Sequence, residues 1–344
     1  MTIATPALQR LRDGYGRVAE DLRVSLTDRC NLRCSYCMPA EGLAWLPGPT
    51  ILRDDEVVRL VRVAVEQLGV HTVRFTGGEP LLRPGLERII AAVRGLRTPQ
   101  GEPPQTALTT NGIGLDRRLD DLVAAGLQRV NISLDSLDRE RYARLARRDR
   151  LPDVLRSLAA VAASGLRPVK VNAVVMRATN EQDVVPLAEY CLERGYQLRF
   201  IEQMPLGPRH GWDRSAMVTA AEVLDRLQQR YRLVPLPDRG AAPSEDWQVV
   251  GDGGRVLGRI GVIASVTRPF CRACDRTRLT ADGQVRNCLF SQTETDLRTP
   301  LRAGAEDAEL AGLWVGAHLA KGPGHGIGTP GFEPPRRTMS SIGG

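Results

Sequence analysis

The chain has 344 residues with a formal net charge of +7, and 42% of them are hydrophobic but only 4% aromatic. That composition supports a folded core and argues against a disordered chain, and no apolar run approaches the ~20 residues of a membrane-spanning helix. The basic balance indicates an anionic partner such as nucleic acid, a membrane surface or a phosphorylated small molecule, although so modest a charge also fits an ordinary solubilising surface.

The N-terminal stretch 1–26 lacks the charged start, apolar run and small-residue cleavage site of a signal peptide. We therefore expect a cytoplasmic protein, in which thiols stay reduced. The chain has seven cysteines, and an odd number fits metal ligands better than a disulfide framework.

Strand-like and helix-like patterns alternate along the chain from about residue 22 to residue 204. Short apolar or alternating runs predict strands, and amphipathic patterns predict the helices between them. Cys191 falls on the apolar face of the last helix and is expected to be a small buried hydrophobe, not a ligand. The expected strands are 22–27, 72–76, 106–110, 129–134, 169–175 and 197–204, and the expected helices are 54–68, 86–97, 116–125, 152–163 and 181–194.

Strands that are each followed by a helix predict an α/β fold with a parallel sheet and right-handed crossovers. Six such units are two short of a closed eight-fold barrel. We therefore expect an open, partial (βα)6 TIM-type barrel, with the active site at the carboxyl ends of the strands. After residue 231 the chain becomes rich in Pro and Gly. We expect residues 1–231 to form the barrel and residues 232–344 to form a smaller α+β extension that closes the open side.

Three cysteines follow the first strand, at the rim where the active site is expected. Cys30, Cys34 and Cys37 have the spacing C-x3-C-x2-C, and the segment TGGEP (76–80) ends the second strand at the same rim. A structural zinc site takes four protein ligands and a disulfide takes two. Three thiols therefore indicate a site that leaves one coordination position free.

A second group of three cysteines, Cys271, Cys274 and Cys288, lies in the extension. The segment before Cys288 predicts a hairpin with Asp282-Gly283 as a two-residue turn, which would return Cys288 towards Cys274. Zinc bound by four of the six thiols, or with a distant histidine from positions 71, 210, 318 and 325, stays open on spacing alone. Two groups of three favour two [4Fe–4S] clusters, each with one iron open to another ligand.

The scarcity of lysine singles out two further positions. Only Lys170 and Lys321 are lysines among the 47 basic residues. Lysine and arginine differ where a compact point charge or a narrow space matters. A lysine in a chain that otherwise uses arginine therefore indicates a position that needs a compact charge. Lys170 lies near the start of a strand and is the stronger candidate, whereas Lys321 lies in a Gly/Pro-rich stretch.

Taken together, the motifs resemble those of the radical S-adenosylmethionine (SAM) superfamily. C-x3-C-x2-C with Tyr36 before its last cysteine, followed by GGEP after the next strand, is typical of that superfamily. The second group with spacing C-x2-C-x13-C, the RTR at 276–278 and the C-terminal MSSIGG resemble the GTP 3',8-cyclases of molybdenum cofactor biosynthesis. The resemblance runs from about residue 20 to residue 344.

The resemblance implies that the first three cysteines hold a [4Fe–4S] cluster whose open iron binds SAM, which is cleaved after one-electron reduction to a 5'-deoxyadenosyl radical. Gly77 and Gly78 would let backbone approach SAM closely, and Glu79 would accept a hydrogen bond from its ammonium group. The residues that the resemblance places against SAM are Tyr36, Gly78, Glu79, Ser133 and Met204. Strand-end packing would also account for the last two.

The resemblance also implies a GTP site. Arginine binds phosphate oxygens in a bidentate manner, and a charge on a barrel strand is costly unless it is paired. Arginines within strands therefore fit a phosphate pocket, and the alternative is ion pairs with carboxylates such as Glu202. Thr72 stands where many family members have a lysine, for which another arginine could substitute. The residues that match GTP-binding positions are Arg23, Arg74, Thr109, Lys170, Arg199, Arg276 and Arg278.

In this family the second cluster, on Cys271, Cys274 and Cys288, takes the guanine base. The radical removes the ribose 3' hydrogen, and C3' attacks C8 to give (8S)-3',8-cyclo-7,8-dihydroguanosine 5'-triphosphate. The implied partners are a low-potential electron donor and, downstream, cyclic pyranopterin monophosphate synthase. Gly343 and Gly344 are expected to act in catalysis, because backbone without a Cβ can enter a narrow pocket.

Two other interpretations stay open. A different radical SAM enzyme with an auxiliary cluster, such as a peptide-modifying one, would share the first motif, and a zinc-stabilised nucleic-acid-binding protein would also use cysteines and basic residues. The basic residues form no stripe interleaved with aromatic residues, so we expect neither a nucleic-acid nor a membrane partner. The sequence leaves open whether the chain forms a homodimer.

Overall fold

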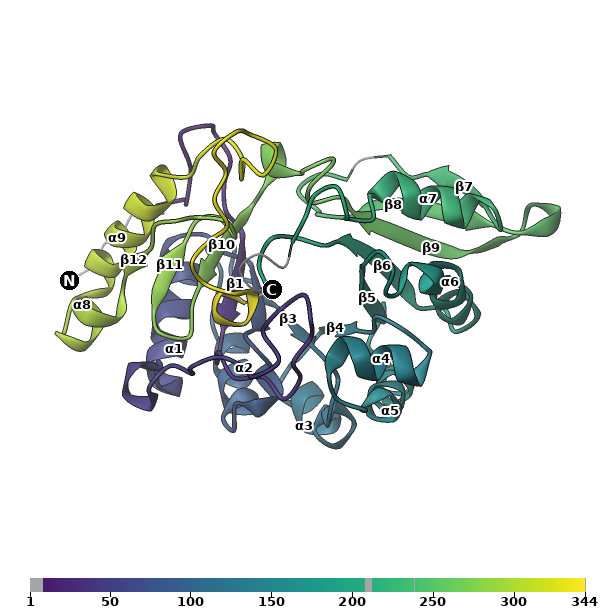
Figure 1. Ribbon diagram of the computed structural model, residues 1–344. Helices are drawn as coiled ribbons and strands as arrows, with labels where there is room; N and C mark the ends of the chain where they lie inside the picture. The colour runs from purple at the N-terminus through teal and green to yellow at the C-terminus, as the bar shows by residue number, and fades with distance from the viewer. Residues whose placement is uncertain (1–8, 208–211, 238, 344) are drawn as a thin grey trace.

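The computed structural model describes residues 9–207, 212–237 and 239–343. They form one 12-stranded sheet with the strand order β12-β11-β10-β1-β2-β3-β4-β5-β6-β9-β8-β7. The middle of the sheet is parallel and curves into an open arc (Figure 1), so the predicted partial barrel is confirmed. Its strands are β1 (Asp21–Ser25), β2 (Thr72–Thr76), β3 (Gln105–Thr110), β4 (Arg129–Ser133), β5 (Lys170–Val175) and β6 (Gln197–Glu202).

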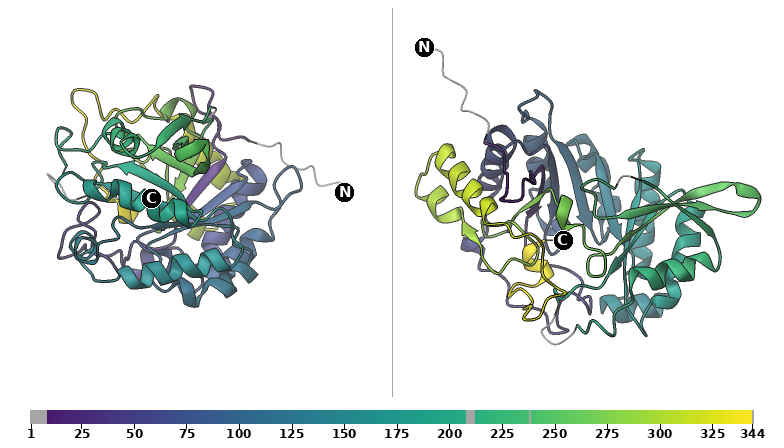
Figure 2. Two further views of the ribbon diagram at one scale, coloured as in Figure 1. Left: turned by 90° about the vertical axis from the view of Figure 1, so that its right-hand side faces the viewer. Right: turned by 90° about the horizontal axis from the view of Figure 1, so that it is seen from above.

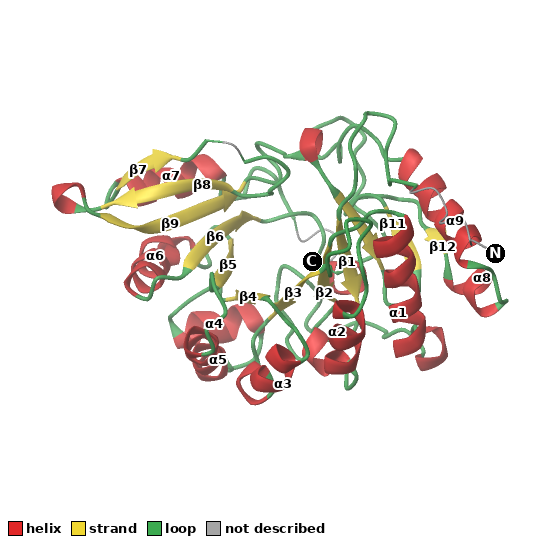
Figure 3. Ribbon diagram, turned by 180° about the vertical axis from the view of Figure 1, so that it is seen from behind, coloured by secondary structure: helices red, strands yellow, loops and turns green. Residues whose placement is uncertain are grey.

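Helices cover the outer side of this arc (Figure 3). α1 buries Val57, Leu60 and Val61, the positions that its 3.6-residue period marks, and Glu56 caps it by accepting from the N–H of Arg53 at 2.8 Å. No helix within the described ranges is long and apolar enough to cross a membrane. The helices are α1 (Asp54–Arg62), α2 (Leu86–Arg94), α3 (Leu119–Ala124), α4 (Arg139–Ala146), α5 (Leu151–Ala163), α6 (Val184–Glu193) and α7 (Ala220–Gln228).

The chain after residue 231 joins the same sheet at both edges. The edge strands of an open barrel expose unpaired N–H and C=O groups, and here β9 pairs in parallel with β6 while β10 pairs in parallel with β1. The β8–β9 hairpin reaches out beyond the helices (Figures 1 and 2). The added elements are β7 (Arg232–Pro235), β8 (Glu245–Val250), β9 (Val256–Ile263), β10 (Arg276–Leu279), β11 (Gln284–Arg286), β12 (Thr295–Asp296), α8 (Arg298–Arg302), α9 (Asp307–Leu319) and α10 (Met339–Ile342).

The predicted hairpin is present, but its turn is longer than two residues. β10 and β11 are antiparallel, and the N–H of Thr280 donates to the carbonyl of Gln284 at 2.9 Å. Thr280 also donates to the carboxylate of Asp282 at 2.6 Å, and Gly283 takes a positive φ of 78°. The loop is therefore three residues long, because the Asp282 side chain bonds back to Thr280 and the chain turns at Gly283.

Cys191 has no exposed surface and packs in the main hydrophobic core, so the prediction of a buried small hydrophobe is confirmed. Replacing Cys191 with Ser should lower the free energy of unfolding by about 1–3 kcal/mol, because the hydroxyl loses water on burial. Cys191→Ala, which adds no polar group, should cost less. Urea unfolding measures both, and iron content should stay unchanged. A loss of iron in both variants would instead make Cys191 a ligand.

Candidate active site

The inner face of the arc carries a row of arginines. Side chains two residues apart on a strand face the same side. Arg278, Arg23 and Arg74 lie opposite one another on β10, β1 and β2. Arg74 lies opposite Ala107 on β3, which lies opposite Arg129 on β4. The small Ala107 leaves space at the middle of the row.

Three further cations, Lys170, Arg199 and Arg276, lie close to this row. Burial and then the neighbouring arginines lower the pKa of Lys170 to about 8. Burial and Arg74 likewise lower the pKa of Arg199 to about 10. Both groups stay mostly charged at neutral pH, because the shifted values remain above 7. The structure therefore gathers all six cations that the sequence assigned to GTP, and it adds Arg129.

These cations have few partners among the described residues. The buried Nε atoms of Arg23, Arg74, Arg129, Arg199 and Arg276 have no hydrogen-bond acceptor there. A buried donor without an acceptor is costly and indicates a missing ligand or water. The donors and their surplus charge suit a polyanion.

Glu202, the carboxylate that could have paired with these arginines, is used elsewhere. It accepts from the N–H groups of Ala220 and Val266, each at 2.8 Å, and from Thr267. It therefore connects the start of α7 to the segment after β9. Asp21 and Asp275 are acids near the row. Although burial acts to raise the pKa of Asp21, Arg23 and Arg74 hold that pKa below its ordinary value.

Five of these cations line a cavity of about 290 Å³, together with many of the other predicted residues, whereas Lys170 and Arg129 are not in its lining. Predicted residues lining it are Arg23, Tyr36, Arg74, Thr109, Ser133, Arg199, Met204, Cys271, Cys274, Arg276, Arg278 and Cys288. Lining residues that the sequence reasoning missed include Asp21, Asn131, Asp135, Asn172, Phe270 and His325. Strand alternation could have found Asn131 and Asn172, because each lies two residues from a predicted site residue on the same strand. No local signal marks Phe270, whose ring centroid lies 4.6 Å from the guanidinium carbon of Arg276.

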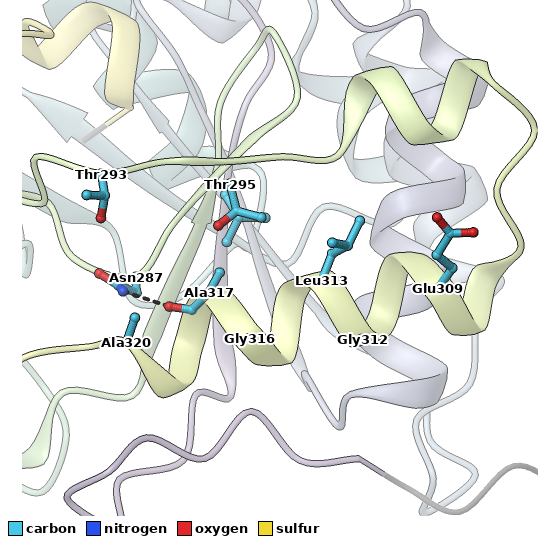
Figure 4. Close-up of a pocket in the computed structure, with 10 residues that line it drawn as sticks. Asn287, Thr293, Thr295, Glu309, Gly312, Leu313, Gly316, Ala317 and Ala320 are labelled. Carbon is cyan, nitrogen blue, oxygen red and sulfur yellow. Dashed lines mark hydrogen bonds between the residues drawn. The ribbon is translucent and has the colours of Figure 1, made fainter.

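A more voluminous hollow, about 550 Å³, lies between α9 and the strands β11 and β12 (Figure 4). Gly312, Gly316 and Ala320 line it, together with Asn287, and it contains no thiol and no cation. Volume alone does not assign a site, whereas converging polar groups do. The smaller central cavity is therefore the candidate site.

The first cysteine group lies in the loop after β1, packed under the end of β2. A Cβ on Gly78 would lie 2.3 Å from the carbonyl oxygen of Arg29, and a Cβ on Gly77 would lie 2.5 Å from that of Thr27. The close approach that these glycines permit is therefore to the cysteine loop itself. Their approach to SAM, including that of Gly78, stays a prediction.

The three cysteines of this group are half-buried. Burial raises the pKa of Cys30 to about 11, and burial with Cys30 raises the pKa of Cys37 to about 12. A metal centre that binds thiolates must therefore displace protons here. No three His, Cys, Asp or Glu side chains are gathered as around a single ion in the part of the chain that the structure describes. A four-iron cluster instead holds each thiolate on a different iron, and three thiols in one short loop fit that donor set.

Glu79 and Tyr36 have partners within the chain. The buried carboxylate of Glu79 accepts from the N–H groups of Leu81 at 3.0 Å and Asn111 at 2.7 Å, and from the hydroxyl of Thr110 at 2.7 Å. Glu79 does not line the cavity, so its contact with SAM stays a prediction. Tyr36 lines the cavity and donates to Asp135 at 2.8 Å.

All three cysteines of the second group line the cavity. His325 lies beside them, although it is far away in the sequence. One of its nitrogens is 2.8 Å from the carbonyl of Ser265, and the other accepts from the N–H of Ile327 at 3.1 Å. His325 is therefore not placed as a fourth zinc ligand, and His210 lies outside the described residues.

The C-terminal tail enters the arc from its inner side (Figure 1). Gly343 has a φ of +84°, and a Cβ there would lie 2.4 Å from the hydroxyl of Thr76. Its carbonyl accepts from Arg278 at 2.5 Å. Gly343 thus occupies a position that a larger residue would not fit, between the ends of β1 and β2, while Gly344 lies outside the described residues.

Comparisons with known proteins agree with this site. The profile of the family described as "Radical SAM superfamily" matches residues 24–191, and that of "Molybdenum Cofactor Synthesis C" matches residues 196–327. The chain is 62% identical over 336 residues to a GTP 3',8-cyclase of Corynebacterium glutamicum, covering 97% of this chain and 89% of that one. It is 57% identical over 341 residues to a GTP 3',8-cyclase of Mycolicibacterium smegmatis, covering 98% and 93%.

Among solved structures, SuiB of Streptococcus suis bound to its precursor peptide SuiA has a TM-score of 0.59 at 14% identity, covering 88% of this chain and 67% of that one. At that identity the likeness shows a shared fold alone. The full-length relatives decide between the interpretations that the sequence left open: the chain belongs to the GTP 3',8-cyclase family, within the radical SAM superfamily.

Proposed function

We propose that this GTP 3',8-cyclase, an enzyme of the first step of molybdenum cofactor biosynthesis, binds the triphosphate of GTP on the inner-face cations and the guanine base beside the second cysteine group. The observation that carries the proposal is the set of buried guanidinium nitrogens without acceptors that surround the cavity. A triphosphate supplies several oxygens for bidentate contacts and balances the surplus charge.

Family membership implies SAM and an iron–sulfur cluster, and we assign two clusters. Cys30, Cys34 and Cys37 would hold one [4Fe–4S] cluster, and the second cysteine group would hold the other. With SAM bound, the first cluster would supply the 5'-deoxyadenosyl radical for removal of the ribose 3' hydrogen. Tyr36, Ser133 and Met204 line the same cavity, which supports their assignment to SAM along with Gly78 and Glu79.

We further propose that residues 232–344 close the open side of the barrel over the substrate. A small apolar cluster away from the main core supports this closure, because it joins Leu206 and Met217 to residues of the C-terminal part. Its other buried members are Val266, Phe290, Ile327 and Ile342. Covering the cavity in this way would exclude water from the radical, which limits side reactions.

The proposed reaction needs partners of defined chemistry. A low-potential donor must supply the electron for SAM cleavage, and cyclic pyranopterin monophosphate synthase would consume the cyclised nucleotide. A cytoplasmic location and a homodimer stay predictions.

Anaerobic incubation of the reconstituted protein with GTP, SAM and dithionite should yield the cyclised nucleotide, detected by mass analysis. Iron and sulfide should each total about eight per chain if both groups carry four-iron clusters. Replacing the first three cysteines with Ala should halve the iron and abolish SAM cleavage, whereas replacing the second three should halve the iron and leave uncoupled SAM cleavage. Stoichiometric zinc without iron would contradict the assignment.

Arg129 is our candidate to replace the lysine missing at Thr72, because it lies on the inner face two strands from Arg74. Arg129→Gln should raise the KM for GTP by at least about tenfold, or about 1.4 kcal/mol. Thr72→Lys in the same chain should restore binding, since Thr72 is on the same face as Arg74. The exposed Arg97→Gln is the matched control. An unchanged KM in Arg129→Gln would remove Arg129 from the site.

Arg337 anchors the tail and should couple radical formation to cyclisation. Its guanidinium pairs with Asp282 at 2.8 Å and Glu294 at 2.7 Å. Burial acts to raise the pKa of Asp282, but Arg337 and Thr280 hold that pKa below its ordinary value. Arg337→Gln should therefore loosen the segment that leads to Gly343 while leaving iron content and SAM cleavage intact. We expect at least a tenfold fall in cyclised nucleotide formed per 5'-deoxyadenosine.

The neighbouring Arg336→Gln is the control for this experiment, because Arg336 is exposed. It should keep the wild-type ratio of the two products. Equal ratios in both variants would mean that anchoring the tail has no part in coupling.

A further inference from the structure

Lys321 follows α9 and is buried, with only 4% of its surface exposed. Its ammonium group donates to the carbonyl oxygens of Cys274 and Arg276 at 3.2 and 3.0 Å, and to the sulfur of Cys274 at 3.5 Å. Three N–H groups thus meet three acceptors. Two of these acceptors belong to a cysteine that lines the central cavity.

The geometry explains why this position is a lysine in a chain that uses arginine almost everywhere else. An ammonium group directs three donors from a single point, whereas a guanidinium presents a planar fork. The ammonium group of Lys321 donates its hydrogen bonds to two carbonyl oxygens and a thiol, and not to a carboxylate. A buried cation without a counter-ion is costly, so a negative charge at Cys274 is the missing partner.

The surrounding fold holds Lys321 at this place. The indole of Trp314 donates to the hydroxyl of Thr277 at 2.9 Å, which ties α9 to β10. The side chain of Asn287 donates to the carbonyl of Ala317 at 2.7 Å, which ties α9 to the residue before Cys288 (Figure 4). α9 is therefore fixed to both sides of the hairpin that carries the second cysteine group.

The chain after Lys321 continues around the same group. A Cβ on Gly324 would lie 3.5 Å from the Cβ of Cys271. Arg17 donates to the carbonyls of Cys271 at 2.7 Å and Gly322 at 2.6 Å, which joins this segment to the cysteine loop. The segment 321–325 therefore packs against the loop that carries Cys271 and Cys274.

We propose that Lys321 is a positioning residue of the second cluster: it fixes the Cys274 ligand, and its charge favours the reduced form of the cluster. The proposal rests on the two-cluster assignment made above. Reduction adds one electron, supplied by dithionite, and makes the centre more negative without forming or breaking a bond. A fixed cation 3.5 Å from a ligand sulfur stabilises that form, because the interaction is little screened in a buried site.

The test uses the full chain with Cys30, Cys34 and Cys37 replaced by Ala, so that only the second cluster remains. Its reduction is followed by electron paramagnetic resonance in a potentiometric titration. Lys321→Gln should keep about four irons per chain. At a given potential, its ratio of reduced to oxidised cluster should be at least tenfold lower than in the parent, which corresponds to a midpoint potential lower by about 59 mV for a one-electron couple. Lys321→Arg keeps the charge and should shift the potential less, with an altered spectrum.

Arg272→Gln is the matched control, because Arg272 lies between two of the cysteines but is exposed. It should leave the potential close to that of the parent, since solvent screens its charge. The same potential and spectrum in Lys321→Gln and the parent would overturn the proposal, whereas a parent without iron would overturn the two-cluster assignment itself.

Discussion

Buried positive charge on the inner face of the barrel strands is the constraint on which the rest of the site depends. Two nearby carboxylates are used for other purposes: Glu202 holds the start of α7, and Glu79 joins the ends of β2 and β3. Asp21 and Asp275 lie among the cations, but they are fewer than the cations and offset only part of the charge. Repulsion among the cations opposes folding around an empty cavity. A polyanion that binds the folded chain and not the unfolded one therefore stabilises the fold as well as starting the reaction.

The parallel strands could be predicted from sequence because alternation is a local pattern, and all six were found close to their true bounds. α4 was missed because its segment is highly charged, although Asp138 caps it by accepting from the N–H of Arg141 at 2.7 Å. The attachment of the C-terminal strands to both edges could not be predicted either. Asp21 lies opposite Arg276, and no local pattern encodes a partner so distant in the sequence.

In the site, the cysteines and arginines were found because their residue types carry the chemistry. Residues defined by distant partners were missed, such as Asp135, which receives the hydroxyl of Tyr36. Lys321 shows the same limit: its Gly/Pro-rich surroundings made it a weaker candidate than Lys170, yet the fold brings it onto Cys274. A polar side chain acquires its role from neighbours that only the tertiary structure supplies.

The pairing of β1 with β10 also sets the order in which parts of the chain can fold during synthesis. Domains begin to fold from the N-terminus while the ribosome is still working, but residues 276–279 are among the later ones to emerge. Until then, the outer edge of β1 lacks its partner strand, and the cysteine loop that follows β1 remains open on that side. The cysteines proposed to hold the first cluster are thus complete in a nascent barrel, whereas those proposed to hold the second are complete only in the nearly finished chain.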